Sequence, residues 1–115
     1  MFLEPAKYKE AQVMEQAVII KFNYGLNDLK PFYDLSEKLD SIVEKSGLGE
    51  YDGHEMEVDK SDGFFYLYGP DAKKLYEVIK DTIENTSFMN GAKIKLRFGP
   101  PEDGVGEISF NLNLN

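Results

Sequence analysis

The chain has 115 residues, 42% of them apolar, and its 21 acidic and 13 basic residues give a formal net charge of −8. This length predicts one domain around one hydrophobic core, and the negative charge disfavours nucleic-acid or membrane-surface binding because it repels phosphate groups. The chain contains no cysteine, which excludes disulfides, thiolate nucleophiles and zinc or iron–sulfur sites bound by cysteine.

The first 14 residues are polar, and their weak helical spacing predicts a short helix or an ordered tail. Residues 1–10 show no basic segment followed by an apolar run, so we expect no signal peptide. No window approaches the roughly 20 apolar residues of a membrane span. These features predict a cytoplasmic protein.

Residues 17–24 are predicted to form the first strand, because they are rich in β-branched and aromatic side chains and end at Gly25. The residues on the less apolar face of this strand are Ile19, Lys21 and Asn23. A helix is expected next, with Asn27 and Asp28 at its start and Gly47 at its end. Its apolar residues recur at helical spacing: Phe32, Leu35, Leu39, Ile42 and Val43.

An acidic second strand is predicted over roughly residues 51–58, with a bulge or bend at Asp52-Gly53. A polar hairpin loop at residues 59–63 leads to an aromatic third strand. In that strand the rings of one face are Phe64, Tyr66 and Tyr68, and the other face carries Phe65 and Leu67. Both faces are therefore apolar. A core can cover one of them, and the second requires an extra strand, a partner chain or a ligand.

The segment Gly69-Pro70-Asp71 is expected to start a second helix. Its predicted buried stripe is Ala72, Leu75, Val78, Ile79 and Ile83. Residues 93–97 alternate as a fourth strand, and residues 107–114 alternate again after a linker rich in Gly, Pro and acids. This last segment predicts an additional C-terminal strand, which pairs within the chain or crosses to a partner sheet.

The element order β-α-β-β-α-β is that of the split, ferredoxin-like sandwich. The predicted fold class is therefore α+β, with an antiparallel sheet, two helices on one of its faces and an additional C-terminal strand. We expect one domain over residues 1–115. Its parts are an N-terminal extension (1–14), a ferredoxin-like core (15–98), a linker (99–106) and the C-terminal strand (107–115).

In the usual strand order 4-1-3-2, the sheet face away from the helices has a basic edge, an aromatic centre and an acidic edge. Its residues are Lys93, Lys95 and Arg97, then Ile19, Lys21 and Asn23, then Phe64, Tyr66 and Tyr68, then Glu55 and Glu57. Such a face fits a homodimer in which the basic edge of one copy meets the acidic edge of the other. It also fits tyrosines that merely tolerate half-exposed positions between charged strands, which protect the edges from aggregation.

Single-stranded nucleic acid is a further interpretation of these rings, since bases stack on exposed aromatic strands. The net charge and the acid Asp62 in place of a leading basic residue disfavour it. The acidic run from Glu50 to Asp62 lacks calcium-loop spacing. It fits a solvated face, or a patch that binds a basic protein partner, as in an acidic inhibitor or immunity-type protein.

His54 is the only histidine in the chain. With Asp52 it could form an oriented acid–base pair or a metal edge, in a small-molecule enzyme or carrier that also uses nearby tyrosines. A catalytic metal normally takes three protein ligands, and no obvious third ligand is present. We expect His54 to be a polar residue on an edge strand. The prediction is therefore a non-enzymatic interaction module, without cofactor or metal, that self-associates through its aromatic sheet face or its C-terminal strand.

Three segments, in this order, resemble the motifs of a group of small bacterial proteins. The motif D-G-x-E is similar to Tyr51-Asp-Gly-His-Glu55, and L-Y-G-P-D-A is similar to Leu67-Tyr-Gly-Pro-Asp-Ala72. The motif G-A-x-V-x-L-R-x-G is similar to Gly91-Ala-Lys-Ile-Lys-Leu-Arg-Phe-Gly-Pro-Pro101. The resemblance covers about residues 15–110 and implies a ferredoxin-like α+β fold and a bacterial origin. No activity is established for that group, so the resemblance assigns no functional residue.

Overall fold

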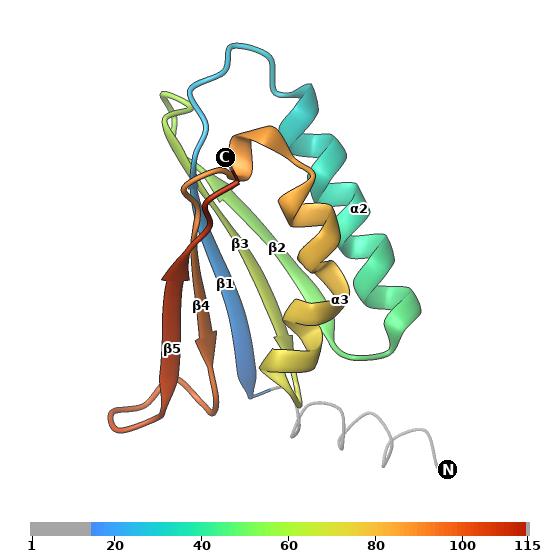
Figure 1. The fold of residues 1–115 in the computed structure, drawn as a ribbon, viewed down its shortest axis with the longest axis vertical. Coiled ribbons are helices and arrows are strands. Elements are labelled where there is room, and N and C mark those ends of the chain that lie inside the picture. Colours follow the sequence, from blue (N-terminus) through green and yellow to red (C-terminus); the bar gives the residue numbers. More distant parts are fainter. Residues whose placement is uncertain (1–14, 115) are drawn as a thin grey trace.

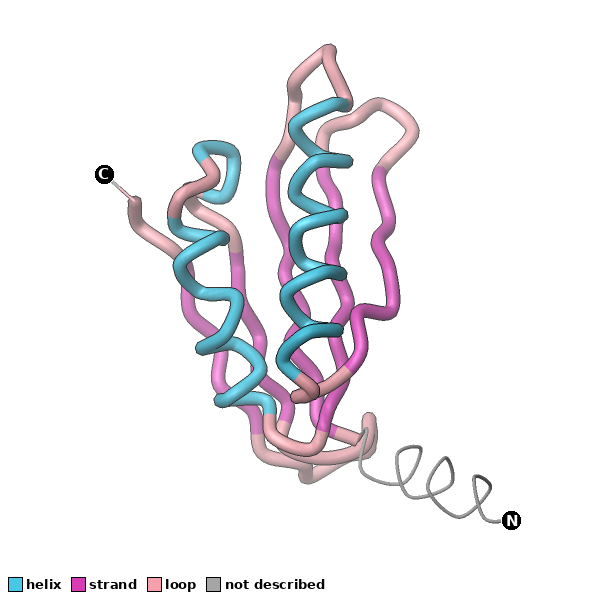
Figure 2. Tube along the Cα trace, turned by 90° about the vertical axis from the view of Figure 1, so that its right-hand side faces the viewer, coloured by secondary structure: helices cyan, strands magenta, loops and turns pink. Residues whose placement is uncertain are grey.

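A computed structural model describes residues 15–114 of the chain, and the N-terminal extension predicted from the sequence lies outside these residues. The fold is α+β, with five antiparallel strands in one open sheet and two α-helices on one side of it (Figures 1 and 2). The elements are β1 (Gln16–Asn23), α2 (Lys30–Ser46), β2 (Glu50–Met56), β3 (Asp62–Gly69), α3 (Ala72–Glu84), the 3₁₀ turn η1 (Ser87–Met89), β4 (Lys93–Arg97) and β5 (Glu107–Asn111). Across the sheet the strands follow the order β2-β3-β1-β4-β5. This arrangement is compatible with a ferredoxin-like class.

The core lies between the sheet and the two helices and is built on three stacked phenylalanines. The ring centroid of Phe65 on β3 lies 4.9 Å from that of Phe22 on β1 and 5.5 Å from that of Phe32 on α2. All three rings are at most 1% exposed, and each such burial is worth about 1.5–3 kcal/mol. The stack therefore holds α2 against the two central strands.

The helix ends show which start and stop signals operate. Gly47 ends α2 in the left-handed conformation (φ 69°), as the sequence predicts. The predicted start at Asn27-Asp28 is wrong, because α2 begins at Lys30 with Leu29 as its N-cap. The Asp28 carboxylate accepts a hydrogen bond from the Lys30 backbone N–H (2.9 Å), which forms a local turn ahead of the helix instead of a cap.

The second helix starts at the predicted segment. The Asp71 side chain caps α3 by accepting a hydrogen bond from the Lys74 backbone N–H (3.1 Å). Its buried stripe contains Tyr76, which the sequence-based stripe omitted, whereas Val78 is only half-buried. Tyr76 is covered from β5, where the ring of Phe110 meets it edge-on at 5.6 Å.

Two glycines let the backbone before β2 lie directly against the end of β3. A Cβ atom on Gly69 would overlap the backbone oxygen of Leu48, and one on Gly49 would overlap that of Tyr68. Both obstacles are backbone atoms, which cannot rotate away as a side chain can. This close approach aligns β2 with β3 at one end of the sheet.

The variant Gly69→Ala should therefore lower the free energy of unfolding by about 1–3 kcal/mol, because the added methyl group overpacks this contact. The matched control is Gly106→Ala, where the new Cβ would meet Phe98 at an ordinary 3.9 Å and the change should stay within about 0.5 kcal/mol. Urea unfolding monitored by circular dichroism measures both. Equal losses in the two variants would contradict the proposed close approach.

Candidate interaction surface

The strand register places residues from all five strands in three rows across the face of the sheet that points away from the helices. The first row is Glu55, Phe64, Lys21, Lys93 and Asn111, in the order β2, β3, β1, β4, β5. The second row is Gly53, Tyr66, Ile19, Lys95 and Ser109. The third row is Glu50, Tyr68, Ala17, Arg97 and Glu107. We call these three rows the open face.

Charge changes in order across the open face. Carboxylates lie on β2, rings on β3, and three basic side chains on β4. The rings of Phe64, Tyr66 and Tyr68 are each half-buried. Among residues 15–114 no helix or strand lies over them, since both helices pack on the opposite face (Figure 2). The structure thus brings the acidic, aromatic and basic residues of the predicted face onto one side of the sheet.

Contacts within the chain hold two of the rings in place. The Tyr66 hydroxyl donates a 2.6 Å hydrogen bond to the Glu55 carboxylate. The rings of Tyr66 and Phe64 stack with a 5.8 Å separation and planes only 6° apart. The ammonium group of Lys21 lies 5.9 Å from the Phe64 ring centre. These side chains are therefore ordered before anything binds to them.

Backbone contacts also orient the basic end of the third row. The Arg97 guanidinium donates hydrogen bonds to the carbonyl oxygens of Gly99 (2.7 Å) and Glu15 (3.3 Å). Beside it lies a shallow hollow of about 470 Å³. Its lining residues are Glu15, Glu50, Tyr68, Arg97, Pro100 and Pro101. The open face is therefore concave at this end, where acidic and basic groups both border the hollow.

Two residues of the predicted face lie at its limits. Glu57 follows the end of β2, and its backbone N–H donates to Asp62 O (2.9 Å) across the hairpin. Asn23 is the last residue of β1 and pairs with Asp62. Both are exposed, and neither belongs to the three rows.

The predicted polar pair is split by the structure of β2. The register shifts between Tyr51 and Gly53, which makes Asp52 the extra residue of the predicted β-bulge. His54 lies on the helix side of the sheet, with its ring 4.7 Å from that of Phe32 and 6.0 Å from that of Tyr33. No hydrogen bond or ion pair joins Asp52 to His54 in the part of the chain that the structure describes. Nor do His, Asp and Glu residues in that part form a group of three that could hold a metal ion.

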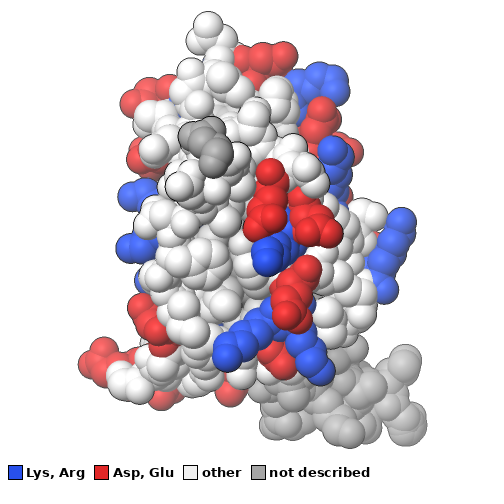
Figure 3. Space-filling model, viewed as in Figure 1, with Lys and Arg blue, Asp and Glu red and all other residues white. Residues whose placement is uncertain are grey.

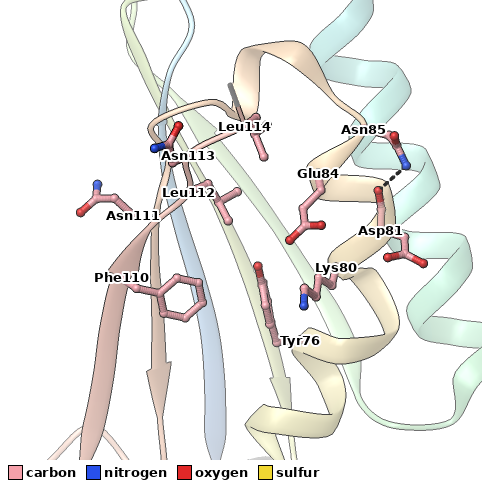
Figure 4. Close-up of a pocket in the computed structure, with 10 residues that line it drawn as sticks. All are labelled: Tyr76, Lys80, Asp81, Glu84, Asn85, Phe110, Asn111, Leu112, Asn113 and Leu114. Carbon is pink, nitrogen blue, oxygen red and sulfur yellow. Dashed lines mark hydrogen bonds between the residues drawn. The ribbon is translucent and has the colours of Figure 1, made fainter.

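A second concavity, which sequence reasoning missed, lies between α3 and the C-terminal strand (Figure 4). It has a volume of about 650 Å³. Its lining residues are Tyr76, Lys80, Asp81, Glu84, Asn85, Phe110, Asn111, Leu112, Asn113 and Leu114. Burial, and then the charge of Glu84, raise the pKa of Tyr76 above its ordinary value. Figure 3 shows acidic and basic side chains gathered over α3, beside a mostly uncharged surface over β5.

The helical spacing contained a signal for this groove. Tyr76 follows Ala72 by four residues and precedes Ile79 by three, so it shares their face of α3. The aromatic ring on that face predicts a neighbour beyond the four-stranded core, which β5 supplies through Phe110. The groove is a consequence of β5 extending the sheet past α3.

The comparisons with known proteins give no relative. No protein-family model matches the chain, and it matches no curated protein and no solved structure. The resemblance to the bacterial group with D-G-x-E and L-Y-G-P-D-A motifs therefore stays a prediction. None of the helices in residues 15–114 has the length and apolar character that crossing a membrane requires.

The environment of Tyr66 makes a titration experiment informative. Burial, and then the hydrogen bond and charge of Glu55, raise the pKa of Tyr66 from 10.0 to about 12. Because the raised pKa means that the folded state favours the neutral phenol, the stability it contributes is complete below pH 10 and is lost as the pH rises towards 12.

Replacement of Glu55 by Gln should lower the pKa of Tyr66 but leave it above its ordinary value, because the burial remains. Ultraviolet titration of the tyrosines, with Tyr66→Phe identifying the signal, measures this change. Glu57→Gln is the matched control, since it removes an acid of the same hairpin that does not contact Tyr66. An unchanged Tyr66 pKa in Glu55→Gln would contradict the hydrogen bond.

Proposed function

We propose that the protein is a non-enzymatic interaction module that forms a homodimer through its open face. The proposal includes a cytoplasmic location and a ferredoxin-like topology with β5 as the additional strand. The observation that carries it is the order of side chains across the three rows, from acidic β2 through aromatic β3 and the mixed residues of β1 to basic β4. A face with this order is complementary to itself.

A two-fold axis parallel to the strands, above the boundary between β3 and β1, satisfies this complementarity. It places β2 of one copy over β4 of the other, and β3 over β1. Because the axis follows the strand direction, each row meets the same row of the second copy. Sheets that pack face to face keep their strands within about 30° of each other and lie about 10 Å apart. The central row is therefore aligned best.

The contacts expected in each row follow from this axis. In the first row, Glu55 of each copy faces Lys93 of the other, and Phe64 faces Lys21. In the third row, Glu50 faces Arg97. An axis perpendicular to the strands would instead place β2 over β2 and β4 over β4, with like charges facing each other. The charge order therefore favours the axis parallel to the strands.

The aromatic centre supplies the hydrophobic part of the contact. The half-buried rings of β3 and the side chain of Ile19 lose their remaining contact with water, at roughly 25 cal/mol for each Å² of apolar surface. The stacking of Phe64 on Tyr66 and the bond from Tyr66 to Glu55 already restrict these side chains. Dimerisation then costs less side-chain entropy.

A basic protein partner is the second candidate, because the carboxylates of the acidic run are not neutralised by a basic side chain of the described residues. None of its acids takes part in the two ion pairs found within residues 15–114, Lys30–Asp34 and Lys95–Glu107. Enzyme or carrier activity at Asp52 and His54 has weaker support. Neither the hollow on the open face nor the groove beside α3 is lined by these two residues.

A charge exchange between Glu55 and Lys93 tests the dimer. Within one chain the two residues lie three strand spacings of about 4.8 Å apart, about 14 Å in total, so they do not contact each other. Glu55→Lys and Lys93→Glu should each weaken the dimer by about tenfold or more, because like charges facing across an interface cost on the order of several kcal/mol and about 1.4 kcal/mol is a factor of ten. The double variant should restore it.

Sedimentation velocity over a range of protein concentrations measures this series. The control is Glu44→Lys on the exposed side of α2, which should leave the dissociation constant unchanged. If the double variant dissociates as readily as the single variants, the proposed axis is wrong. If the protein instead binds a basic protein partner, binding of that partner should be lost in Glu55→Lys and kept in Lys93→Glu.

A further inference from the structure

The outer edge of β5 is open. β5 is the last strand of the sheet, and its outer edge pairs with no element in residues 15–114 (Figure 1). Two backbone hydrogen bonds fix which groups point outwards. Gly106 O accepts from the N–H of Phe98 (2.9 Å), and the N–H of Leu112 donates to Ala92 O (2.9 Å), so residues 106 and 112 point towards β4.

Backbone groups alternate between the two sides of an antiparallel strand. Residues 108 and 110 therefore also bond towards β4. The residues whose N–H and C=O point away from the sheet are Glu107, Ser109 and Asn111. In the part of the chain that the structure describes, these six backbone groups pair with no strand, so they form an edge that is ready to accept one.

The opposite edge strand of the sheet, β2, has features that hinder pairing with another strand, and β5 lacks most of them. On β2 the bulge at Asp52 breaks the register, and Gly53 has a φ of 125° that bends the strand. Two carboxylates, Glu50 and Glu55, also lie on this edge. In contrast, β5 pairs with β4 without a register shift and contains no proline, lysine or bulge. Of the usual devices against edge pairing, β5 has only its short length of five residues and one charge, Glu107, so its edge is less protected than that of β2.

We propose that β5 pairs antiparallel with β5 of a second copy, about a two-fold axis at Ser109. In this register Ser109 faces Ser109, and Glu107 faces Asn111. All outward-pointing backbone groups of both strands are then hydrogen-bonded, and every such residue belongs to a hydrogen-bonded pair. A shift along the edge in either direction leaves outward groups unpaired, because the strand has only five residues.

The side chains agree with this register. On the helix side Ile108 of each copy faces Phe110 of the other, in the closely spaced type of pair. Ile108 is 45% exposed in the single chain, and this pairing covers it. Phe110 forms one wall of the groove beside α3 (Figure 4), so Ile108 of the second copy adds to that wall. On the open side the pair of Glu107 with Asn111 brings no like charges together.

This contact goes beyond the proposed dimer and uses a different surface. The axis of the edge contact is perpendicular to the sheet, whereas the axis of the open-face contact runs along the strands. The open-face contact covers β2, β3, β1 and β4 and leaves the outer edge of β5 free. Both contacts can therefore form in one assembly, and each can be removed separately.

A cysteine at the axis tests the register directly, because the natural chain has no cysteine. In Ser109→Cys the two Cα atoms should lie about 5.5 Å apart, within the range of about 4.4–6.8 Å that a disulfide spans. Mild oxidation should give a covalent dimer as the main product on non-reducing gels. Glu44→Cys, on the exposed side of α2, is the control and should stay monomeric. Equal cross-linking of the two variants would overturn the proposal.

Proline at position 109 tests the hydrogen bonds. Ser109→Pro removes an N–H that points away from β4, so the ladder within the chain stays intact. Ser109→Thr keeps the donor and is the matched control, and circular dichroism confirms folding of both. We expect sedimentation to show loss of the edge contact in Ser109→Pro only. Identical profiles for Ser109→Pro and Ser109→Thr would overturn the proposal.

The two contacts are distinguished by combining variants. If both form, Ser109→Pro still dimerises through the open face, and Lys93→Glu still dimerises through β5. If the open-face proposal alone fails, the wild type is a dimer that Ser109→Pro converts to a monomer and that Lys93→Glu leaves intact. If the edge proposal alone fails, Lys93→Glu is monomeric and Ser109→Pro keeps the wild-type profile.

Discussion

A sheet has two faces, and within residues 15–114 the helices cover only one of them. The consequence is concentrated in β3, where successive residues are large and apolar on both sides. Phe65 and Leu67 enter the core and are fully buried, whereas Phe64, Tyr66 and Tyr68 remain half-buried on the open face. The stack of Phe65 with Phe22 and Phe32 is what commits β3 to this orientation. A shift of β3 by one residue relative to its neighbouring strands would exchange its two faces.

The same stack and the glycine contact at the start of β2 align the rows of the open face. The residues of a row lie side by side only if the strands β2, β3, β1 and β4 keep their register. Different contacts fix the register at the two ends of β3. At one end the backbones of Leu48 and Gly69 lie in direct contact, and at the other Glu57 bonds to Asp62 across the hairpin. The charge order that supports the proposed dimer thus depends on interactions in the core and the turns, away from the surface itself.

The local elements were predictable because their signals are local. Alternation located β1 and β4 to within a residue, the Asp52-Gly53 dipeptide indicated the bulge, and Gly47 marked the end of α2. Features that depend on distant parts of the chain were not predictable. The helical spacing places Tyr76 on the buried face of α3, but it does not reveal what covers the ring. β5 brings Phe110 against it, and the groove exists only because of that contact. The rows required the register of every strand pair, which period-2 alternation does not contain.

The bulge on β2 has a consequence for how far any edge-to-edge assembly can extend. A molecule whose two sheet edges both accept strands can add copies without limit, and this is how cross-β fibres polymerise. In this protein the Asp52 bulge interrupts the edge of β2, so the proposed edge contact has only β5 to use. In the proposed edge contact, each copy uses its β5 edge once, so edge-to-edge addition stops at two molecules. On this proposal, the dipeptide Asp52-Gly53 in β2 limits the length of an assembly that forms at the opposite edge of the sheet, at β5.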